Sequence, residues 1–265
     1  MSSASNALLI DLDGVIYQGE QAVAGAVDAI SWLQQTEVPH LYVTNTTSRP
    51  RKAIVTKLAA MGAFIAEERI FTPPVAASTW LRQLGIRRVA LFVPKATRED
   101  FADFDMLPDH AESGAQAVIV GDLGEAWDFQ TMNRAFRLLM QQPSPHLIAL
   151  GMTRYWRAED GLRLDTAPFV TALAHASGVE PRVLGKPAQA FFAAAATLLG
   201  TTAEQTWMLG DDIRADVSGA QAAGLKGILV RTGKFRDQDL DSEVEPDAVL
   251  DSFADLPDWW ESAAD

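Results

Sequence analysis

The chain contains no cysteine among its 265 residues, which excludes disulfides and thiolate metal sites and is typical of the cytoplasm. It also has no apolar run near the ~20 residues that a membrane-spanning helix requires. Residues 1–6 lack the basic and apolar regions of an export signal. These absences predict a cytoplasmic protein with no membrane partner.

Positive charge is scarce as well. The 22 lysines and arginines stand against 35 aspartates and glutamates, which gives a formal net charge of −13. A chain this acidic is repelled by nucleic acid and by anionic membranes, so neither is expected as a partner. A phosphorylated substrate stays compatible with this composition, because a bound divalent cation and one or two local cations can dominate a pocket.

Several catalytic signatures are missing too. The sequence contains no HExxH, no GxSxG and no GxGxxG, and residues 227–234 hold one residue too many for a P-loop. The four histidines lie singly, which favours core or surface roles over metal binding. Carboxylates are therefore the main candidates for chemistry.

The sequence does contain an alternation of strand and helix patterns along almost its whole length, which predicts an α/β fold with a mainly parallel sheet. Strand-like apolar runs lie at residues 7–10, 40–44, 89–93, 117–120, 147–150, 206–209 and 228–230. Helical patterns lie at residues 25–35, 129–140 and 169–176.

Two aspartates follow the first of these strands. Asp11 and Asp13 come directly after an unbroken apolar run and directly before Gly14, where an open parallel sheet places its ligands. Two acids this close do not both ionise cheaply without a cation. One interpretation is a helix cap plus a turn; the other is a metal-assisted site where one carboxylate attacks and its neighbour moves a proton.

A second group of acids follows the strand at residues 206–209. Asp211 and Asp212 come after Gly210, and Asp216 lies about one helical turn further on. Carboxylates at a strand end are the ligands that a hard divalent cation requires. Asp122 follows the strand at residues 117–120 in the same way, and we interpret it as a residue that lines a pocket.

Two further turns carry groups suited to a phosphate. Thr44 and Asn45 leave one strand and lead into a helix, so hydroxyl, amide and backbone N–H groups converge there. Lys186 lies between Gly185 and Pro187 and could neutralise a phosphate and a nucleophile together. Taken alone, each turn is explained equally well as a cap or as a solvated loop.

In their order along the chain, these motifs resemble those of the haloacid dehalogenase superfamily of aspartate-nucleophile phosphohydrolases. The matching residues are Asp11-x-Asp13-Gly14, Thr44, Lys186, and Gly210-Asp211-Asp212 with Asp216. The long insertion before Lys186 is similar to the C2-type α/β cap of the NagD-like subfamily. The resemblance implies a Rossmann-like three-layer α/β/α core over residues 1–84 and 181–265, and a cap over residues 85–180.

The resemblance also implies roles for these residues. Asp11 would attack phosphorus to form an aspartyl-phosphate, and Asp13 would act as acid and then as base. Thr44, Asn45 and Lys186 would hold the phosphoryl oxygens. The implied cofactor is Mg²⁺, held by Asp11, the Asp13 backbone carbonyl and Asp211, with Asp212 or Asp216 in support.

The cap would select the substrate. By position, the candidates are the loop at residues 122–127 and the segment at residues 153–156, with Asp122, Arg154 and Tyr155 as the candidate specificity residues. Arg154 could meet a second anionic group, or it could be a surface arginine beside core aromatics. Caps of this family often mediate dimers, so a homodimer through the cap is compatible with the resemblance.

The function expected from these motifs is hydrolysis of small phosphorylated molecules by a Mg²⁺-dependent phosphatase. Phosphomonoesters, pyrophosphate and phosphoramidates such as phospholysine and phosphohistidine share this chemistry, and the sequence leaves the choice open. A phosphotransferase and a catalytically quiet binding protein are the alternatives. The complete motif set argues against the quiet protein, since none of the matched positions is replaced.

Overall fold

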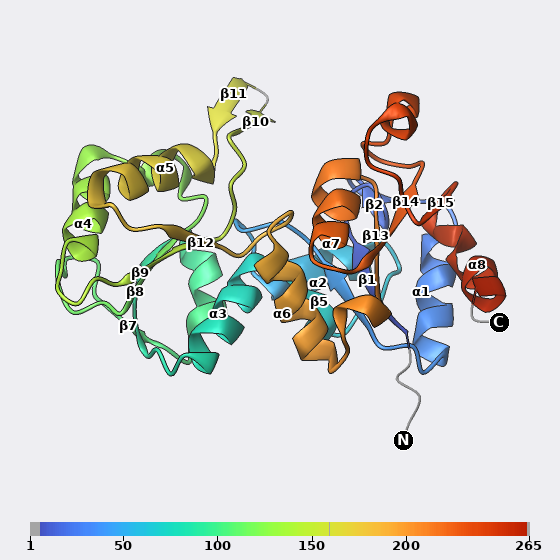
Figure 1. Ribbon diagram of the computed structural model, residues 1–265, viewed down its shortest axis with the longest axis horizontal. Helices are drawn as coiled ribbons and strands as arrows, with labels where there is room; N and C mark the ends of the chain where they lie inside the picture. Colours follow the sequence, from blue (N-terminus) through green and yellow to red (C-terminus); the bar gives the residue numbers. More distant parts are fainter. Residues whose placement is uncertain (1–5, 159, 264–265) are drawn as a thin grey trace. The chain divides into compact units, whose positions relative to one another are not determined.

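The computed structural model describes residues 6–158 and 160–263. Residues 1–5, which include most of the segment predicted to lack an export signal, lie outside the described part of the chain. The chain separates into two compact units. The first comprises Met1–Thr44, Lys52–Phe71 and Lys186–Asp265, and the second Asn45–Arg51 and Thr72–Gly185. Figure 1 labels the elements of both units.

A six-stranded sheet forms the centre of the first unit, in the order β15-β14-β13-β1-β4-β5. Every neighbouring pair of strands is parallel. The central strand β1 is buried along its whole length, as expected for a strand covered on both faces. The strands are β1 (Ala7–Asp11), β4 (His40–Val43), β5 (Ile70–Phe71), β13 (Thr206–Gly210), β14 (Lys226–Val230) and β15 (Ala248–Leu250).

Helices cover both faces of this sheet. Ile228 and Val230 of β14 belong to a buried cluster that includes residues of α1 (Ala26–Gln35) and α2 (Arg51–Ala60). Leu229, between them, packs instead with Val217, because successive strand residues point to opposite faces. The first unit is therefore a three-layer α/β/α structure.

The other elements of the first unit are short or peripheral. A π-helix, η5 (Ile213–Ser218), follows β13 and contacts β14. The remaining elements are β2 (Tyr17–Gln18), β3 (Gln21–Ala22), α6 (Gln189–Leu199), α7 (Gly219–Ala222), α8 (Leu256–Ala263), η1 (Glu67–Arg69), η4 (Ala203–Gln205), η6 (Asp237–Asp241) and η7 (Phe253–Asp255).

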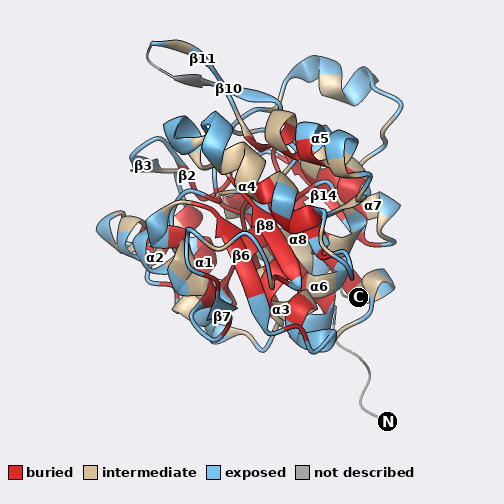
Figure 2. Ribbon diagram, turned by 90° about the vertical axis from the view of Figure 1, so that its left-hand side faces the viewer, coloured by how far each residue is buried: buried red, intermediate tan, exposed pale blue. Residues whose placement is uncertain are grey.

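The second unit has its own parallel sheet of five strands, in the order β12-β9-β8-β6-β7. Figure 2 shows β8 and most of β6 as buried. These strands are β6 (Arg88–Phe92), β7 (Asp105–Met106), β8 (Ala117–Val120), β9 (His146–Ala149) and β12 (Pro181–Val183).

Two helices cover one face of this second sheet. Val118 and Val120 pack in one buried cluster with residues of α4 (Phe129–Leu139) and α5 (Thr166–Ser177), which contact each other. An antiparallel hairpin, β10 (Tyr155–Ala158) and β11 (Gly161–Leu164), precedes α5. The unit also contains α3 (Pro73–Gln83), η2 (Lys95–Phe101) and η3 (Gly124–Ala126).

The predicted α/β fold with mainly parallel sheets is confirmed. The helix expected at residues 169–176 begins earlier, at Thr166, because the Asp165 carboxylate accepts the Thr166 N–H at 2.6 Å and starts α5 there. The core and cap boundaries at residues 84 and 181 stay predictions; the second compact unit also includes α3 and β12. Within the described residues, no helix has the length and apolarity to cross a bilayer.

Candidate active site

The order of the strands brings the predicted motifs to one edge of the first sheet. Strand β1 lies between β4 and β13, and the chain continues from these two neighbours toward opposite edges of the sheet. Asp11 ends β1, Thr44 follows β4 and Asp211 follows β13. A crevice at such a reversal of strand order is where open α/β sheets bind ligands.

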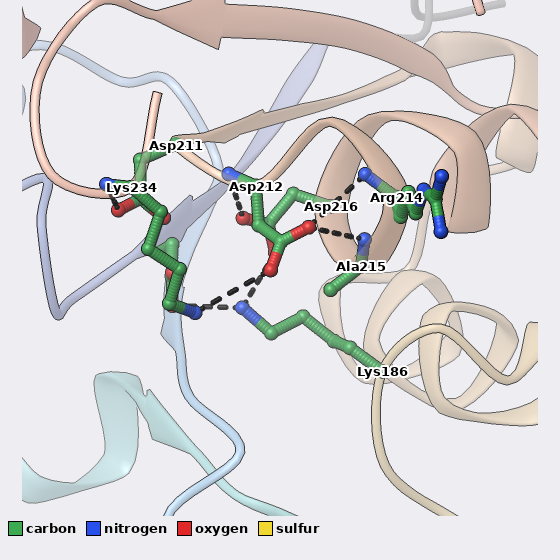
Figure 3. Close-up of polar contacts among 8 residues, drawn as sticks. Lys186, Asp211, Asp212, Arg214, Ala215, Asp216 and Lys234 are labelled. Carbon is green, nitrogen blue, oxygen red and sulfur yellow. Dashed lines mark hydrogen bonds and ion pairs between the residues drawn. The ribbon is translucent and has the colours of Figure 1, made fainter. Parts of the chain in front are cut away.

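A buried ion-pair cluster occupies this edge. The Lys186 ammonium lies 2.8 Å from Asp11 Oδ1 and 2.6 Å from Asp216 Oδ1, and Figure 3 shows Lys186 reaching toward Asp216. The three residues are at most 6% exposed. Burial lowers the pKa of Lys186, but Asp11 and Asp216 raise it above its usual range, so the lysine stays charged. Lys186 is therefore a buried, ion-paired residue and not a solvated lysine in a turn.

Asp211 completes a group of three buried carboxylates. One oxygen each from Asp11, Asp211 and Asp216 lies within 4.8 Å of the others. Asp211 Oδ2 accepts the Lys234 backbone N–H at 2.7 Å, whereas the buried Oδ1 has no hydrogen-bond partner among the described residues. Hard oxygen donors, an uncompensated cluster of charge and an unsatisfied carboxylate oxygen fit a divalent cation.

Asp212 and Asp216 have different surroundings. Asp212 Oδ1 accepts the N–H groups of Arg214 at 3.1 Å and Ala215 at 2.9 Å and caps η5 (Figure 3). Burial raises the pKa of Asp212, but these N–H groups and Lys234 lower it overall. Asp216 is fully buried and belongs to the three-carboxylate group. Of the two acids, only Asp216 belongs to that group; its Oδ1 pairs with Lys186 and its Oδ2 accepts the Asp212 N–H at 3.1 Å.

Asp13 lies apart from this group. It is exposed, on a turn in which Gly14 adopts a φ of 86° and donates its N–H to the Tyr17 carbonyl at 2.7 Å. A side chain at Gly14 would overlap Asp211, since its Cβ would lie 1.9 Å from Asp211 Oδ2. Glycine is therefore required here, and the turn leaves Asp13 accessible to a reacting molecule.

The predicted phosphate-binding residues divide between the two units. Thr44 is buried in the first unit and its N–H bonds the Phe71 carbonyl at 3.1 Å. Asn45 begins the second unit, where its side-chain oxygen lies close to Gly185. Their role in binding a phosphoryl group stays a prediction.

The second unit contains a polar cavity of about 330 Å³ near the carboxyl ends of β8 and β9. Asp122 lines it, but Arg154 and Tyr155 do not; the Arg154 guanidinium lies over the Tyr155 ring at 5.9 Å. The lining also includes Trp156, from the candidate segment at residues 153–156, and Asp165, which the sequence did not single out. The Asp165-Thr166 cap was the signal that could have revealed Asp165.

Lys234 is the other site residue that the sequence analysis missed. Its backbone N–H holds Asp211, and its ammonium lies 3.5 Å from Asp212 Oδ2. The signal was the pair Gly233-Lys234 soon after the strand at residues 228–230, which was compared with a P-loop and given no role in the site.

Comparison with known proteins gives concordant matches. A family model described as haloacid dehalogenase-like hydrolase matches residues 8–106, and a second, HAD-hydrolase-like, matches residues 183–256. The rat phospholysine phosphohistidine inorganic pyrophosphate phosphatase is 37% identical over 97% of this chain and 94% of its own. The bovine haloacid dehalogenase-like hydrolase domain-containing protein 2 is 39% identical over 90% of this chain and 88% of its own.

Solved structures agree on the architecture. A p-nitrophenyl phosphatase from Archaeoglobus fulgidus superposes with a TM-score of 0.85 at 26% identity, covering 97% of this chain and 99% of that one. NagD from E. coli K-12 superposes with a TM-score of 0.83 at 22% identity, covering 95% and 98%, and shows the shared fold.

The acidic cluster predicts that a divalent cation stabilises the protein in a pH-dependent way. Burial raises the pKa of Asp211 and of Asp216, each to about 6. Since these values exceed those of an unfolded chain, the contribution of both carboxyls to stability is present at acidic pH and is lost as the pH rises through about 6. We expect Mg²⁺ to raise the Tm more at about pH 8 than at about pH 5, because the cation replaces the lost protons.

The measurement is thermal unfolding with Mg²⁺ and with EDTA, for the wild type and Asp211→Asn. The variant should lose most of the Mg²⁺-induced shift at both pH values. A shift that is independent of pH, or one retained by Asp211→Asn, would contradict this assignment of the cluster.

Proposed function

Because the chain belongs to the haloacid dehalogenase-like hydrolase family, we propose that it is a Mg²⁺-dependent phosphatase of small phosphorylated molecules that acts through an aspartyl-phosphate. The observation that carries the proposal is the buried Asp11 carboxylate at the end of β1. It lies 2.8 Å from a lysine ammonium and within 4.8 Å of Asp211 and Asp216. A nucleophile, its counter-charge and a set of metal ligands thus meet at one point.

The metal-binding residues in this proposal are Asp11, Asp211 and the Asp13 backbone carbonyl, with Asp216 in support. When bound, the cation would offset the repulsion between an anionic nucleophile and an anionic phosphate. Burial raises the pKa of Asp11 overall, with a contribution from the neighbouring Asp211, and the Lys186 ammonium opposes this rise. Lys186 therefore helps to keep Asp11 ionised and ready to attack.

The reaction divides into two steps. In the first, Asp11 forms a bond to phosphorus while the bond to the leaving oxygen or nitrogen breaks, and Asp13 gives that atom a proton. In the second, Asp13 takes a proton from water, which attacks the aspartyl-phosphate and restores Asp11. Thr44, Asn45 and Lys186 are proposed to hold the phosphoryl oxygens throughout.

Selection of the leaving group is proposed for the second unit, acting as the cap. Its 330 Å³ cavity includes Asn45, which follows the phosphate-binding candidate Thr44 by one peptide bond. Burial and the neighbouring Asp165 raise the pKa of Asp122, so that carboxyl is well suited to a hydrogen bond from a substrate. A homodimer through the cap and a cytoplasmic location stay predictions.

The proposal is tested by phosphate release from p-nitrophenyl phosphate, pyrophosphate, phospholysine and a panel of phosphometabolites, with Mg²⁺ and with EDTA. Release should require the cation and should be abolished in Asp11→Asn. The ranking of substrates decides among phosphomonoester, pyrophosphate and phosphoramidate. Failure of the folded, Mg²⁺-loaded protein to release phosphate from any of them would favour the catalytically quiet alternative.

Asp13→Asn should lower kcat by about 10²–10⁴, the usual contribution of a positioned acid–base. Mg²⁺ affinity should change little, because the Asp13 side chain lies outside the three-carboxylate group. Steady-state kinetics and calorimetric Mg²⁺ titration measure the two quantities. Wild-type turnover in the variant would remove Asp13 from the mechanism.

Asp122→Asn should raise KM for the preferred substrate by about tenfold, the loss expected for one charge-assisted hydrogen bond, while Mg²⁺ affinity stays the same. Asp160→Asn is the matched control, since Asp160 is an exposed cap carboxylate bound to Arg163. Equal KM values for the two variants would exclude the cavity as the leaving-group site.

A further inference from the structure

The segment Thr232–Gly233–Lys234 follows β14 and contacts two of the strand ends that carry the site. The Thr232 hydroxyl donates to the Gly14 carbonyl at 2.6 Å, and the Lys234 backbone N–H donates to Asp211 Oδ2 at 2.7 Å. One three-residue segment therefore bonds both the turn after Asp11 and the carboxylate of Asp211.

Gly233 allows these contacts by its lack of a side chain. A Cβ on Gly233 would lie 1.9 Å from Asp211 Oδ2 and 2.6 Å from Gly14 Cα. Gly14 is equally constrained from the other side, with Asp211 Oδ2 1.9 Å from its ideal Cβ. Both glycines have positive φ, 62° and 86°. The two glycines thus enclose one oxygen of Asp211 between them.

This packing gives the two oxygens of Asp211 different roles. Oδ2 is fixed by the Lys234 N–H and the two glycines, so the carboxylate cannot rotate freely. Oδ1 is buried and has no hydrogen-bond partner among the described residues. Partners of this kind, which orient a metal-binding group from outside, typically contribute a factor of about 10–100 to metal affinity or activity.

We infer that Thr232–Gly233–Lys234 is a positioning segment for the metal site, which fixes Asp211 with Oδ1 available to a divalent cation and holds the Asp11–Gly14 turn against it. The inference rests on the proposed metal site. Thr232 acts through its hydroxyl and Lys234 through its backbone N–H. The Lys234 side chain is 66% exposed and lies 3.5 Å from Asp212, so its ammonium contributes little.

The test is calorimetric Mg²⁺ titration of the full chain, without substrate. Thr232→Val keeps the shape of the side chain and removes the hydroxyl, and should weaken Mg²⁺ binding about 10- to 100-fold. Thr232→Ser restores the hydroxyl and should restore the affinity. Lys234→Met should weaken binding less than about fivefold, as expected for an exposed ion pair.

Thr206→Val is the matched control. Thr206 is fully buried and its hydroxyl also donates to a backbone carbonyl, that of Thr202, at 2.6 Å. It lies at the start of β13, whereas Asp211 follows the end of the same strand. Thr206→Val should lower the Tm like Thr232→Val, without weakening Mg²⁺ binding. Loss of stability and loss of metal affinity are thereby separated.

Equal Mg²⁺ affinity in wild type and folded Thr232→Val would overturn the inference, as would equal losses in Thr232→Val and Thr206→Val. If Thr232→Val does not fold, amide exchange in the wild type decides: Mg²⁺ should slow exchange at Lys234, and unchanged exchange would contradict the inference. If the wild type binds no divalent cation, both the proposed metal site and this inference are contradicted. If the wild type binds the cation and Asp211→Asn does not, the metal site is supported independently of the result for Thr232→Val.

Discussion

The interaction on which the site depends is the buried contact of one lysine ammonium with two carboxylates. Lys186 holds Asp11 and Asp216 at 2.8 and 2.6 Å with almost no access to water. Buried charges are costly unless they are paired, and one lysine does not balance three carboxylates. The residual negative charge at this edge of the sheet is the basis for the proposed divalent-cation site. The same lysine opposes the rise in the pKa of Asp11 that burial causes, so in the proposed mechanism it also favours the ionised form of the nucleophile.

The sheet topology makes this concentration of charge achievable. Parallel strands end at the same edge of a sheet. Strand β1 lies between β4 and β13, and the chain continues from these two strands toward opposite sides of the sheet. Residues as distant in sequence as Asp11 and Asp211, which follow neighbouring strands, therefore lie at the same edge. The close packing of two glycines against Asp211 then fixes the position of its carboxylate. Gly14 and Gly233 have no Cβ, and a Cβ on either would overlap Asp211 Oδ2. The two glycines therefore fix the position of this proposed metal ligand.

Much of the fold and the main acids could be predicted from the sequence. A buried strand followed by carboxylates is recognised from a short stretch of sequence, an unbroken apolar run with acids directly after it. Asp11 and Asp211 belong to this class, although their catalytic roles stay predictions. The different surroundings of Asp212 and Asp216 could not be predicted, since they depend on η5 being a π-helix capped by Asp212. Lys234 was missed because its contact with Asp211 is made by the backbone, which any residue type provides. Asp165 was missed as a cavity residue because its convergence with Asp122 depends on tertiary packing.

The central claim is that Asp11 is a nucleophile that Lys186 keeps ionised. The direct measurement is acid-quenched peptide mapping by mass spectrometry after Asp13→Asn has been mixed with Mg²⁺ and its best substrate. This variant should slow hydrolysis of the intermediate, so we predict a phosphoryl group on the peptide that carries Asp11. Phosphate release that continues with no phosphoryl group on that peptide would show that water attacks the substrate directly, and would contradict the account.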